Sequence, residues 1–349
     1  MARPDTVELR CCFYNAFLLR AARVPLPGRP RYLHSAPAVD ARARELGHRL
    51  AGRYDVAALC EVFDPSEQRA LVSGWHGRGG RHGRPRTAAG PPTLLRRVPL
   101  VKTSGLLTVV DGHAVARTAT HLYRTRGHRF LDADAWAHKG ALLVEVDVGL
   151  AANLEVYSTH LIWGGDLLVP RERHHRSAVA DFRQAQAHEL LDFVRRTHRP
   201  GNATLIVGDF NIDALHPSPA YTDLTGAMSD AGFDDLWLTH GTGPGWTCDL
   251  RKAPEVIAVA DPSDPDRCLD HDMGAPVAMG ADERGEEGAE PGKRIDFAWL
   301  RRATEDDGVT VDVQAVRRLA FLRSPGVEGY EELPFLSDHL GLHVELTLG

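Results

Sequence analysis

Seven short segments rich in β-branched and aromatic residues are spread along this 349-residue chain. Their lengths and the turn-forming residues around them are typical of β-strands. The segments are residues 6–15, 54–63, 140–148, 154–161, 204–211, 294–300 and 340–348. Between them, apolar residues recur at helical spacing in residues 39–50 and 179–193. Strands that alternate with amphipathic helices predict a layered α/β domain, with sheets inside and helices outside.

The length of the chain fits one large domain, because layered α/β folds reach this size as a single unit. The sequence has no internal repeat and no firm boundary, so we expect one catalytic-type domain over residues 1–349. Two segments are predicted to be exposed loops. Residues 74–92 are rich in Arg and Gly, and residues 261–290 hold ten acidic residues against two arginines.

The formal net charge of −6 provides no overall positive field for duplex DNA, although a local basic groove remains open. The start MARPDTVELR lacks a basic-then-apolar signal region, and no apolar run is long enough to span a membrane. We therefore expect a cytoplasmic protein, with secretion by another route left open. Whether Cys248 and Cys268 pair depends on the redox compartment, which the sequence does not decide.

Polar side chains stand where the predicted strands end. In VGDFNID, residues 207–213, an apolar run finishes on Asp209 and Asn211. Polar groups at a buried strand end are costly unless a turn, a cation or a phosphate satisfies them. Each such residue taken alone is more often a turn or capping residue. The other strand ends carry Asn15, Glu61, His160, Asp296, Asp338 and His339, and eight such residues in one fold favour a functional site.

The residue types at these strand ends indicate a hard metal ion. The carboxylates of Glu61, Asp209 and Asp338 are oxygen ligands that suit Mg²⁺ or Mn²⁺. Asn15 and Asn211 offer amide oxygens, whereas a zinc site would call for clustered Cys or His.

A histidine and a further carboxylate complete the chemistry. Asp296 can orient an imidazole and stabilise its protonated form, and Asp338 and His339 are neighbours at the entry of the last strand. A carboxylate, a histidine and a hard metal ion together make a hydrolytic site for phosphate esters.

The ordered motifs resemble the metal-dependent endonuclease/exonuclease/phosphatase superfamily. These motifs are FYN with Asn15, CEVFD with Glu61, STHL with His160, GDFN with Asp209 and Asn211, RIDF with Asp296, and SDH with Asp338 and His339. They extend from about residue 9 to residue 347. Any one of these motifs is weak evidence, but the ordered set is specific.

Within that superfamily, YNAFLL, YDVAALCEVFD, SGLLTVV and DAWAHKGALLVEV are most similar to the neutral sphingomyelinase C branch. The Lys-Gly pair of that branch corresponds here to Lys139 and Gly140. Two departures stand out. Residues 162–165 after STHL read IWGG, where the branch often has a polar residue, and the region before RIDF is acidic instead of carrying the aromatic hairpin of secreted bacterial members.

The resemblance implies a four-layer α/β/β/α sandwich of two mixed β-sheets flanked by helices, with the site where strand ends of both sheets meet. It also implies roles for the site residues. Glu61 would be the principal Mg²⁺ ligand, with Asn15 and Asp338 close to the metal. His339 would be the general base and Asp296 would orient it. Asn211, His160 and Lys139 would contact the phosphate, the last two adding positive charge, and Asp209 would act near the leaving oxygen.

The expected function is a Mg²⁺-dependent phosphodiesterase, with Mn²⁺ or another divalent cation as the alternative cofactor. Its expected substrate is a phospholipid-type phosphodiester that loses phosphocholine or a similar head group by in-line attack of water. The protein would then touch a membrane surface transiently. A DNA nuclease or abasic-site endonuclease is the alternative, less favoured by the acidic balance, and an inositol or other small-molecule phosphatase is also open. The physiological substrate and the oligomeric state do not follow from the sequence.

Overall fold

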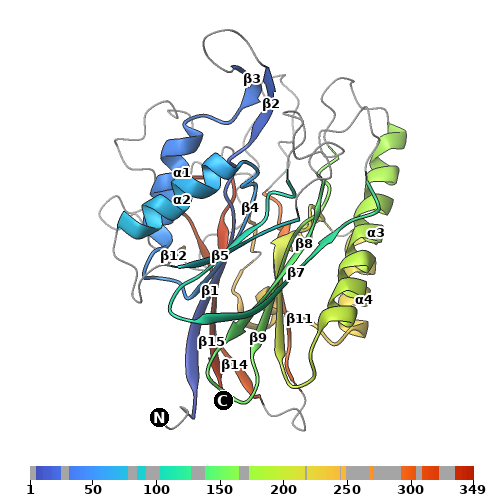
Figure 1. Cartoon of the computed structure of the whole chain (residues 1–349). Coiled ribbons are helices and arrows are strands. Elements are labelled where there is room, and N and C mark those ends of the chain that lie inside the picture. Colours follow the sequence, from blue (N-terminus) through green and yellow to red (C-terminus); the bar gives the residue numbers. More distant parts are fainter. Residues whose placement is uncertain are drawn as a thin grey trace.

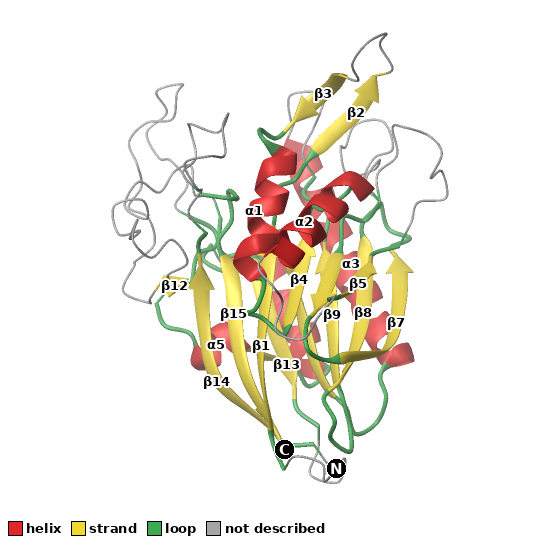
Figure 2. Cartoon of the chain, turned by 60° about the vertical axis from the view of Figure 1, so that its left-hand side comes forward, coloured by secondary structure: helices red, strands yellow, loops and turns green. Residues whose placement is uncertain are grey.

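Two β-sheets packed face to face form the centre of the computed structural model, and helices cover their outer faces (Figure 1, Figure 2). The structure describes residues 5–24, 31–77, 85–91, 103–126, 138–164, 173–216, 218–243, 245–248, 268–269, 292–303, 309–321 and 335–349. The four-layer sandwich of two mixed sheets predicted from the sequence is confirmed. Among the described helices, none has the length and apolar character needed to cross a membrane.

The first sheet has seven strands in the order β12-β14-β15-β1-β4-β6-β5. Its strands are β1 (Val7–Asn15), β4 (Val56–Cys60), β5 (Arg86–Ala89), β6 (Leu107–Val110), β12 (Cys268–Leu269), β14 (Val311–Leu319) and β15 (Gly341–Leu348). Strand β1 pairs parallel with β4 and antiparallel with β15. Helices α1 (Val39–Leu50) and α2 (Pro65–Gly77) lie on its outer face.

The second sheet has six strands in the order β11-β13-β10-β9-β8-β7. They are β7 (Ala114–Leu122), β8 (Gly140–Asp147), β9 (Leu154–His160), β10 (Ala203–Asp209), β11 (Asp234–Asp235) and β13 (Asp296–Arg301). Helices α3 (Arg173–Thr197) and α4 (Pro219–Asp230) pack on its outer face, and α5 (Leu236–His240) follows β11. Strands β2 (Arg20–Val24) and β3 (Arg31–Ser35) form a separate two-stranded sheet.

Side chains alternate between two cores because successive residues of a strand point to opposite faces. On β1, Cys11 and Phe13 pack between the two sheets, whereas Tyr14 packs against the helices of the first sheet. On β10, Leu205 lies between the sheets and Ile206 packs under α3 and α4. Both faces of these strands are therefore buried, which explains their nearly continuous apolar sequences.

All seven predicted strands and both predicted helices are present; the strands are β1, β4, β8, β9, β10, β13 and β15, and the helices are α1 and α3. The exposed loop predicted for residues 74–92 is wrong at its ends. Helix α2 runs to Gly77 with Trp75 fully buried, and β5 pairs with β6. A Cβ at Gly74 would lie 1.8 Å from the carbonyl oxygen of Arg44, so this glycine lets α1 and α2 touch.

The remainder of that segment, residues 78–84 and 92, lies outside the described residues. So does most of the acidic segment 261–290, where the structure describes only Cys268–Leu269, which form strand β12. Cys248 forms no disulfide.

A buried ion network lies at the beginning of β9, five residues before the strand reaches His160. Glu145 on β8 is paired in register with Glu155 on β9, and both are almost fully buried. Arg117 lies between the two carboxylates, with Nε 2.8 Å from Glu145 Oε2 and Nη2 3.0 Å from Glu155 Oε1. His198 Nδ1 lies 2.8 Å from Glu155 Oε2. Arg117 therefore provides a positive charge shared by two buried carboxylates.

Replacing Arg117 with Met is expected to lower the free energy of unfolding by about 3 kcal/mol, because two buried carboxylates lose their shared counter-charge. Urea unfolding measures this change. The matched control is Arg302→Met, which removes an exposed ion pair with Asp234 whose side chains are 43% and 56% accessible. That control should cost at most about 1 kcal/mol. Equal losses in the two variants would contradict a structural role for the network.

Candidate active site

Strand ends of both sheets meet at one edge of the sandwich. In the first sheet, Asn15 ends β1 in register with Cys60, so Glu61 follows directly. In the second sheet, Asp209 is in register with His160 on one side and with Asp296 on the other. Neighbouring strands in register bring their terminal residues together, because side chains at paired positions lie on the same face.

A hydrogen bond joins the two sheets at this edge. Asn15 Nδ2 donates to Asp209 Oδ2 over 3.1 Å, and both residues are almost fully buried. Ser337 Oγ donates to the carbonyl oxygen of Asn15 over 2.6 Å and accepts a hydrogen bond from the backbone N–H of His339 over 3.1 Å. The segment that carries Asp338 and His339 is thereby attached to the end of β1.

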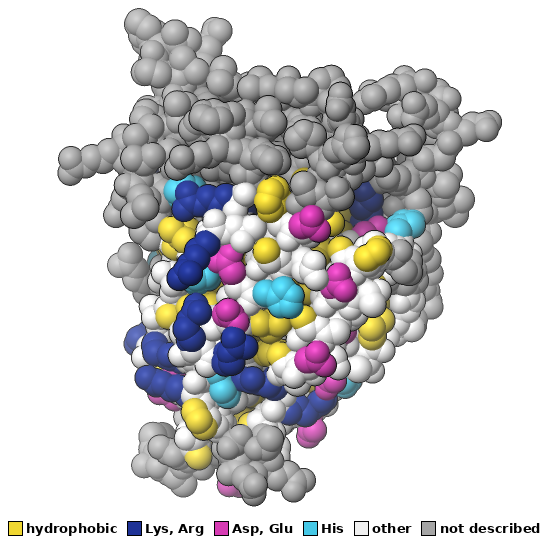
Figure 3. Space-filling model, turned by 90° about the vertical axis from the view of Figure 1, so that its right-hand side faces the viewer, with side chains coloured by type: hydrophobic (Ala, Val, Ile, Leu, Met, Phe, Trp, Pro, Cys, Tyr) yellow, Lys and Arg dark blue, Asp and Glu magenta, His cyan; other side chains and the backbone are white. Residues whose placement is uncertain are grey.

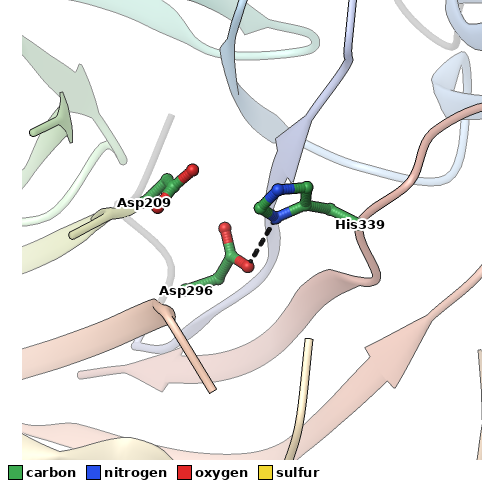
Figure 4. A group of neighbouring side chains, drawn as sticks. All are labelled: Asp209, Asp296 and His339. Carbon is green, nitrogen blue, oxygen red and sulfur yellow. Dashed lines mark hydrogen bonds and ion pairs between the residues drawn. The ribbon is translucent and has the colours of Figure 1, made fainter. Parts of the chain in front are cut away.

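His339 and Asp296 form a hydrogen-bonded pair, with Nδ1 of the imidazole 2.9 Å from Oδ2 of the carboxylate (Figure 4). Thr247 Oγ1 accepts the backbone N–H of Asp296 over 3.2 Å, which holds the backbone of that residue in place. Burial alone would lower the pKa of His339, but the charges of Cys248 and Asp296 and their hydrogen bonds raise it well above its usual value. Without a metal ion these contacts favour the protonated ring, and a cation bound beside it would lower the pKa again and favour the neutral ring that accepts a proton.

Lys139 and His160 form a second pair on the side of the second sheet. Lys139 Nζ lies 3.0 Å from Nδ1 and 2.9 Å from Nε2 of His160, and His160 Nε2 lies 3.5 Å from Asp209 Oδ2. Burial and the charges of Lys139 and His339 lower the pKa of His160 well below its usual value. These surroundings favour the neutral ring of His160 in the protein without substrate, and the positive charge expected of His160 beside a phosphate stays a prediction.

Glu61 and Asn211 have left-handed backbones, with φ of 60° and 53°. Such angles are uncommon for residues other than glycine and are held by the surrounding structure. At Asn211, the backbone N–H donates to Asp209 Oδ1 over 2.9 Å and the side-chain Nδ2 donates to the carbonyl of Leu161 over 3.0 Å. Asp213 accepts the backbone N–H of Leu215 over 3.0 Å, as expected for a turn residue outside the site.

The donors of this edge fit a divalent cation. Burial raises the pKa of Glu61, the charges of Lys139 and His339 oppose the rise, and that of Asp338 adds to it. Among the described residues, the buried Oε2 atom of Glu61 and Oδ1 atom of Asp296 accept no hydrogen bond. Buried carboxylate oxygens without partners are costly, and a cation would satisfy them.

A second group of possible metal ligands lies beside the predicted one. Ligand atoms of Asp209, Asp296 and His339 come within 4.8 Å of one another (Figure 4). Burial raises the pKa of Asp209 to about 7, and the charge of Asp296 adds to the rise. Two such close carboxylates resist ionising together unless positive charge is supplied. All nine predicted site residues thus lie within one connected group.

Cys248 is a neighbour of the site that the sequence did not reveal. Its backbone forms an antiparallel bridge with His339, and its side chain contacts the imidazole. The two residues are ninety-one positions apart in the sequence, and the segment around Cys248 has no strand periodicity. In the sequence, Cys248 stands out only as a possible disulfide partner of Cys268.

Comparison with known proteins places the chain among phosphate-ester hydrolases. The model of the Endonuclease/Exonuclease/phosphatase family matches residues 31–339. No curated protein sequence matches the chain. Similar solved structures include beta toxin from Staphylococcus aureus, with a TM-score of 0.60 and 14% identity over 96% of this chain and 99% of that one.

Two further structures cover almost the whole chain. Sphingomyelinase C from Streptomyces griseocarneus has a TM-score of 0.58 and 17% identity, over 97% of this chain and 99% of that one. D. rerio TDP2 complexed with single strand DNA product has a TM-score of 0.57 and 15% identity, over 97% and 98%. At these identities the structural similarity establishes the shared fold.

Proposed function

The chain belongs to the endonuclease/exonuclease/phosphatase family and is a metal-dependent phosphoric diester hydrolase, and on this premise we propose that its substrate is a phospholipid-type phosphodiester. The products are phosphocholine, or a similar phosphorylated head group, and the lipid alcohol. The cofactor that we propose is Mg²⁺. The cytoplasmic location expected from the sequence stays a prediction.

Lys139 is the observation that carries the substrate proposal. It is 5% exposed and contacts His160 inside the site, at the position where the sphingomyelinase C branch has its Lys-Gly pair. A buried ammonium beside the phosphate site can neutralise the single charge of a phosphodiester, so no extended basic groove of the kind that binds nucleic acid is required. The formal net charge of −6 supports the same choice, because duplex DNA is held by a positive field. Figure 3 shows Lys and Arg side chains along one side of the described part of the face that carries α3, with Asp and Glu side chains between and beside them.

The residues present divide the work of hydrolysis among them. Glu61, Asn15 and Asp338 would hold Mg²⁺, which when bound stabilises charge on phosphoryl oxygens. His339 takes the proton of the attacking water, and Asp296 keeps the imidazole in the tautomer that can accept it.

The opposite side of the site stabilises the phosphoryl group. Lys139 supplies positive charge, and Asn211 donates an N–H to a non-bridging oxygen. His160 positions the ammonium of Lys139. Asp209, which is hydrogen-bonded to Asn15 and Asn211, acts near the leaving oxygen in this proposal. The water attacks the phosphorus in line with that oxygen.

Chelation is expected to abolish head-group release from sphingomyelin and phosphatidylcholine micelles. Excess EDTA removes the divalent cation, and added Mg²⁺ should restore the rate to within about twofold, since metal sites of this kind exchange reversibly. Phosphocholine release measures the reaction. Plasmid, abasic duplex and single-stranded DNA serve as competing substrates at low salt. If the protein cleaves DNA in a metal-dependent way and releases no phosphocholine from lipid, the proposed substrate class is wrong, although the family assignment stands.

A further inference from the structure

Two side chains of α3 hold the segment that follows β9. Gln186 Oε1 accepts the backbone N–H of Ile162 over 2.9 Å, while Gln186 Nε2 donates to the carbonyl of Thr125 over 2.9 Å. The guanidinium of Arg183 donates to the carbonyl of Ile162 over 2.9 Å and to that of Trp163 over 2.6 Å. We call Gln186 and Arg183 the α3 clamp.

Gln186 occupies a position where helical spacing predicts an apolar residue. It is 1% exposed and falls on the same helix face as Val179 and Leu190. A buried carboxamide must satisfy its donors and its acceptor, and Gln186 does so on the backbone of two other segments. Leucine would fill the same space without that requirement. The amide is therefore best explained by the orientation that it imposes.

The held segment in turn fixes Asn211. Leu161, which precedes Ile162, donates its backbone N–H to the carbonyl of Asp209 over 2.8 Å, and its own carbonyl accepts from Asn211 Nδ2 over 3.0 Å. A carboxamide carries two N–H bonds on one end and an oxygen on the other. Because the Leu161 carbonyl takes one N–H, the amide of Asn211 cannot flip, and its second N–H points away from Leu161.

We propose that Gln186 and Arg183 are positioning residues that keep the N–H of Asn211 directed at the phosphoryl oxygen. This inference rests on the proposed function, in which Asn211 donates to a non-bridging oxygen. The route runs from the α3 clamp through the backbone of residues 161–163 to the Leu161 carbonyl and the Asn211 amide. A flipped amide would place its oxygen against the phosphate and oppose the reaction.

A double-mutant cycle tests this route with p-nitrophenylphosphorylcholine and saturating Mg²⁺. Asn211→Ala should lower kcat about 100-fold, as expected for loss of one transition-state donor. Gln186→Leu should lower kcat about tenfold with little change in KM, because misplacement weakens a bond made in the transition state. In the double variant, Gln186→Leu should add nothing to the loss from Asn211→Ala.

Four outcomes separate the possible failures. A tenfold loss that persists in the Asn211→Ala background would overturn the positioning role, as would an undiminished kcat for Gln186→Leu. Undiminished kcat for Asn211→Ala would overturn the role of Asn211 and the inference with it. If the wild-type enzyme hydrolyses other phosphodiesters but not p-nitrophenylphosphorylcholine, the proposed substrate class is contradicted. The same double-mutant cycle would then be run on the phosphodiester that the enzyme does hydrolyse.

The helix offers a matched control and a second clamp variant. Gln184 is two residues away, and its Nε2 donates to Asp223 Oδ2 over 3.1 Å in an exposed pair. Gln184→Leu should leave kcat unchanged. If Gln186→Leu lowers the melting temperature by more than a few degrees, Arg183→Met tests the same route from the half-buried side of the clamp. Gln186→Glu keeps the acceptor for Ile162 and should recover part of the loss.

Discussion

Glu61→Gln is expected to lower turnover at least about 1,000-fold while the protein remains as stable as the wild type or becomes more stable. Burial raises the pKa of Glu61, and its buried Oε2 accepts no hydrogen bond from the described residues. The neutral amide therefore removes a desolvated charge and should not reduce the free energy of unfolding. It also removes the negative oxygen that a hard cation requires, so the same change should disable the reaction.

The measurement is kcat across a Mg²⁺ titration, together with urea unfolding of the metal-free protein. Glu8→Gln is the matched control, because Glu8 is an exposed carboxylate on β1. It should leave both quantities within error of the wild type. Wild-type turnover of Glu61→Gln at the same Mg²⁺ concentration would show that the cation is held elsewhere, with Asp209, Asp296 and His339 as the next candidate ligands.

His339→Ala is expected to lower kcat by about 1,000- to 10,000-fold, because the reaction loses the group that accepts the proton of water. The imidazole is prepared for this task by the contact of its Nδ1 with Asp296 over 2.9 Å. Asp296→Asn should also be slow, since an amide can bind the wrong tautomer of the ring. The two groups act as one unit, so the double variant should be about as slow as His339→Ala alone.

Single-turnover kinetics with a soluble phosphodiester separate this chemical step from substrate binding. His240→Ala provides the control, because His240 is an exposed histidine at the end of α5. Circular dichroism and thermal melting should show that both variants are folded. A fully active His339→Ala enzyme would remove His339 from the mechanism and would leave its contact with Asp296 a structural one.

Much of the site could be predicted because each residue ends a strand. Apolar runs that stop at His160 and Asp209 and one that starts at Asp296 are visible in the sequence, and parallel or antiparallel pairing in register then brings these residues together. The C-terminal part of helix α2 was hidden by its glycines, which suggested a loop, although Gly74 serves close packing against α1. Side chains that act through the backbone of another segment leave no periodic signal. Gln186, for example, is a polar residue at a position where the helical pattern predicts an apolar one, and its bond to the backbone of Ile162 cannot be read from that pattern.

Cys248 is an example of a contact near the site that the sequence does not reveal. Its bridge to His339 depends on how the segment around Cys248 meets the residues just before β15, and local propensity does not determine such a contact. The surroundings of His160 do not follow from the sequence for a similar reason. A histidine near a phosphate site suggests a cation, but desolvation and the adjacent Lys139 favour the neutral ring.

The left-handed backbones at Glu61 and Asn211 set stability against activity at two positions. Glycine would adopt φ values of 60° and 53° without steric strain, yet it would remove the carboxylate and the amide that the chemistry requires. Selection for thermal stability alone would favour glycine at position 61, whereas at Asn211 the buried hydrogen bond to Leu161 opposes it, and selection for hydrolysis excludes glycine at both. In a library screened only for folding, position 61 should drift toward glycine, and its retention of Glu would then mark lineages in which turnover is still under selection.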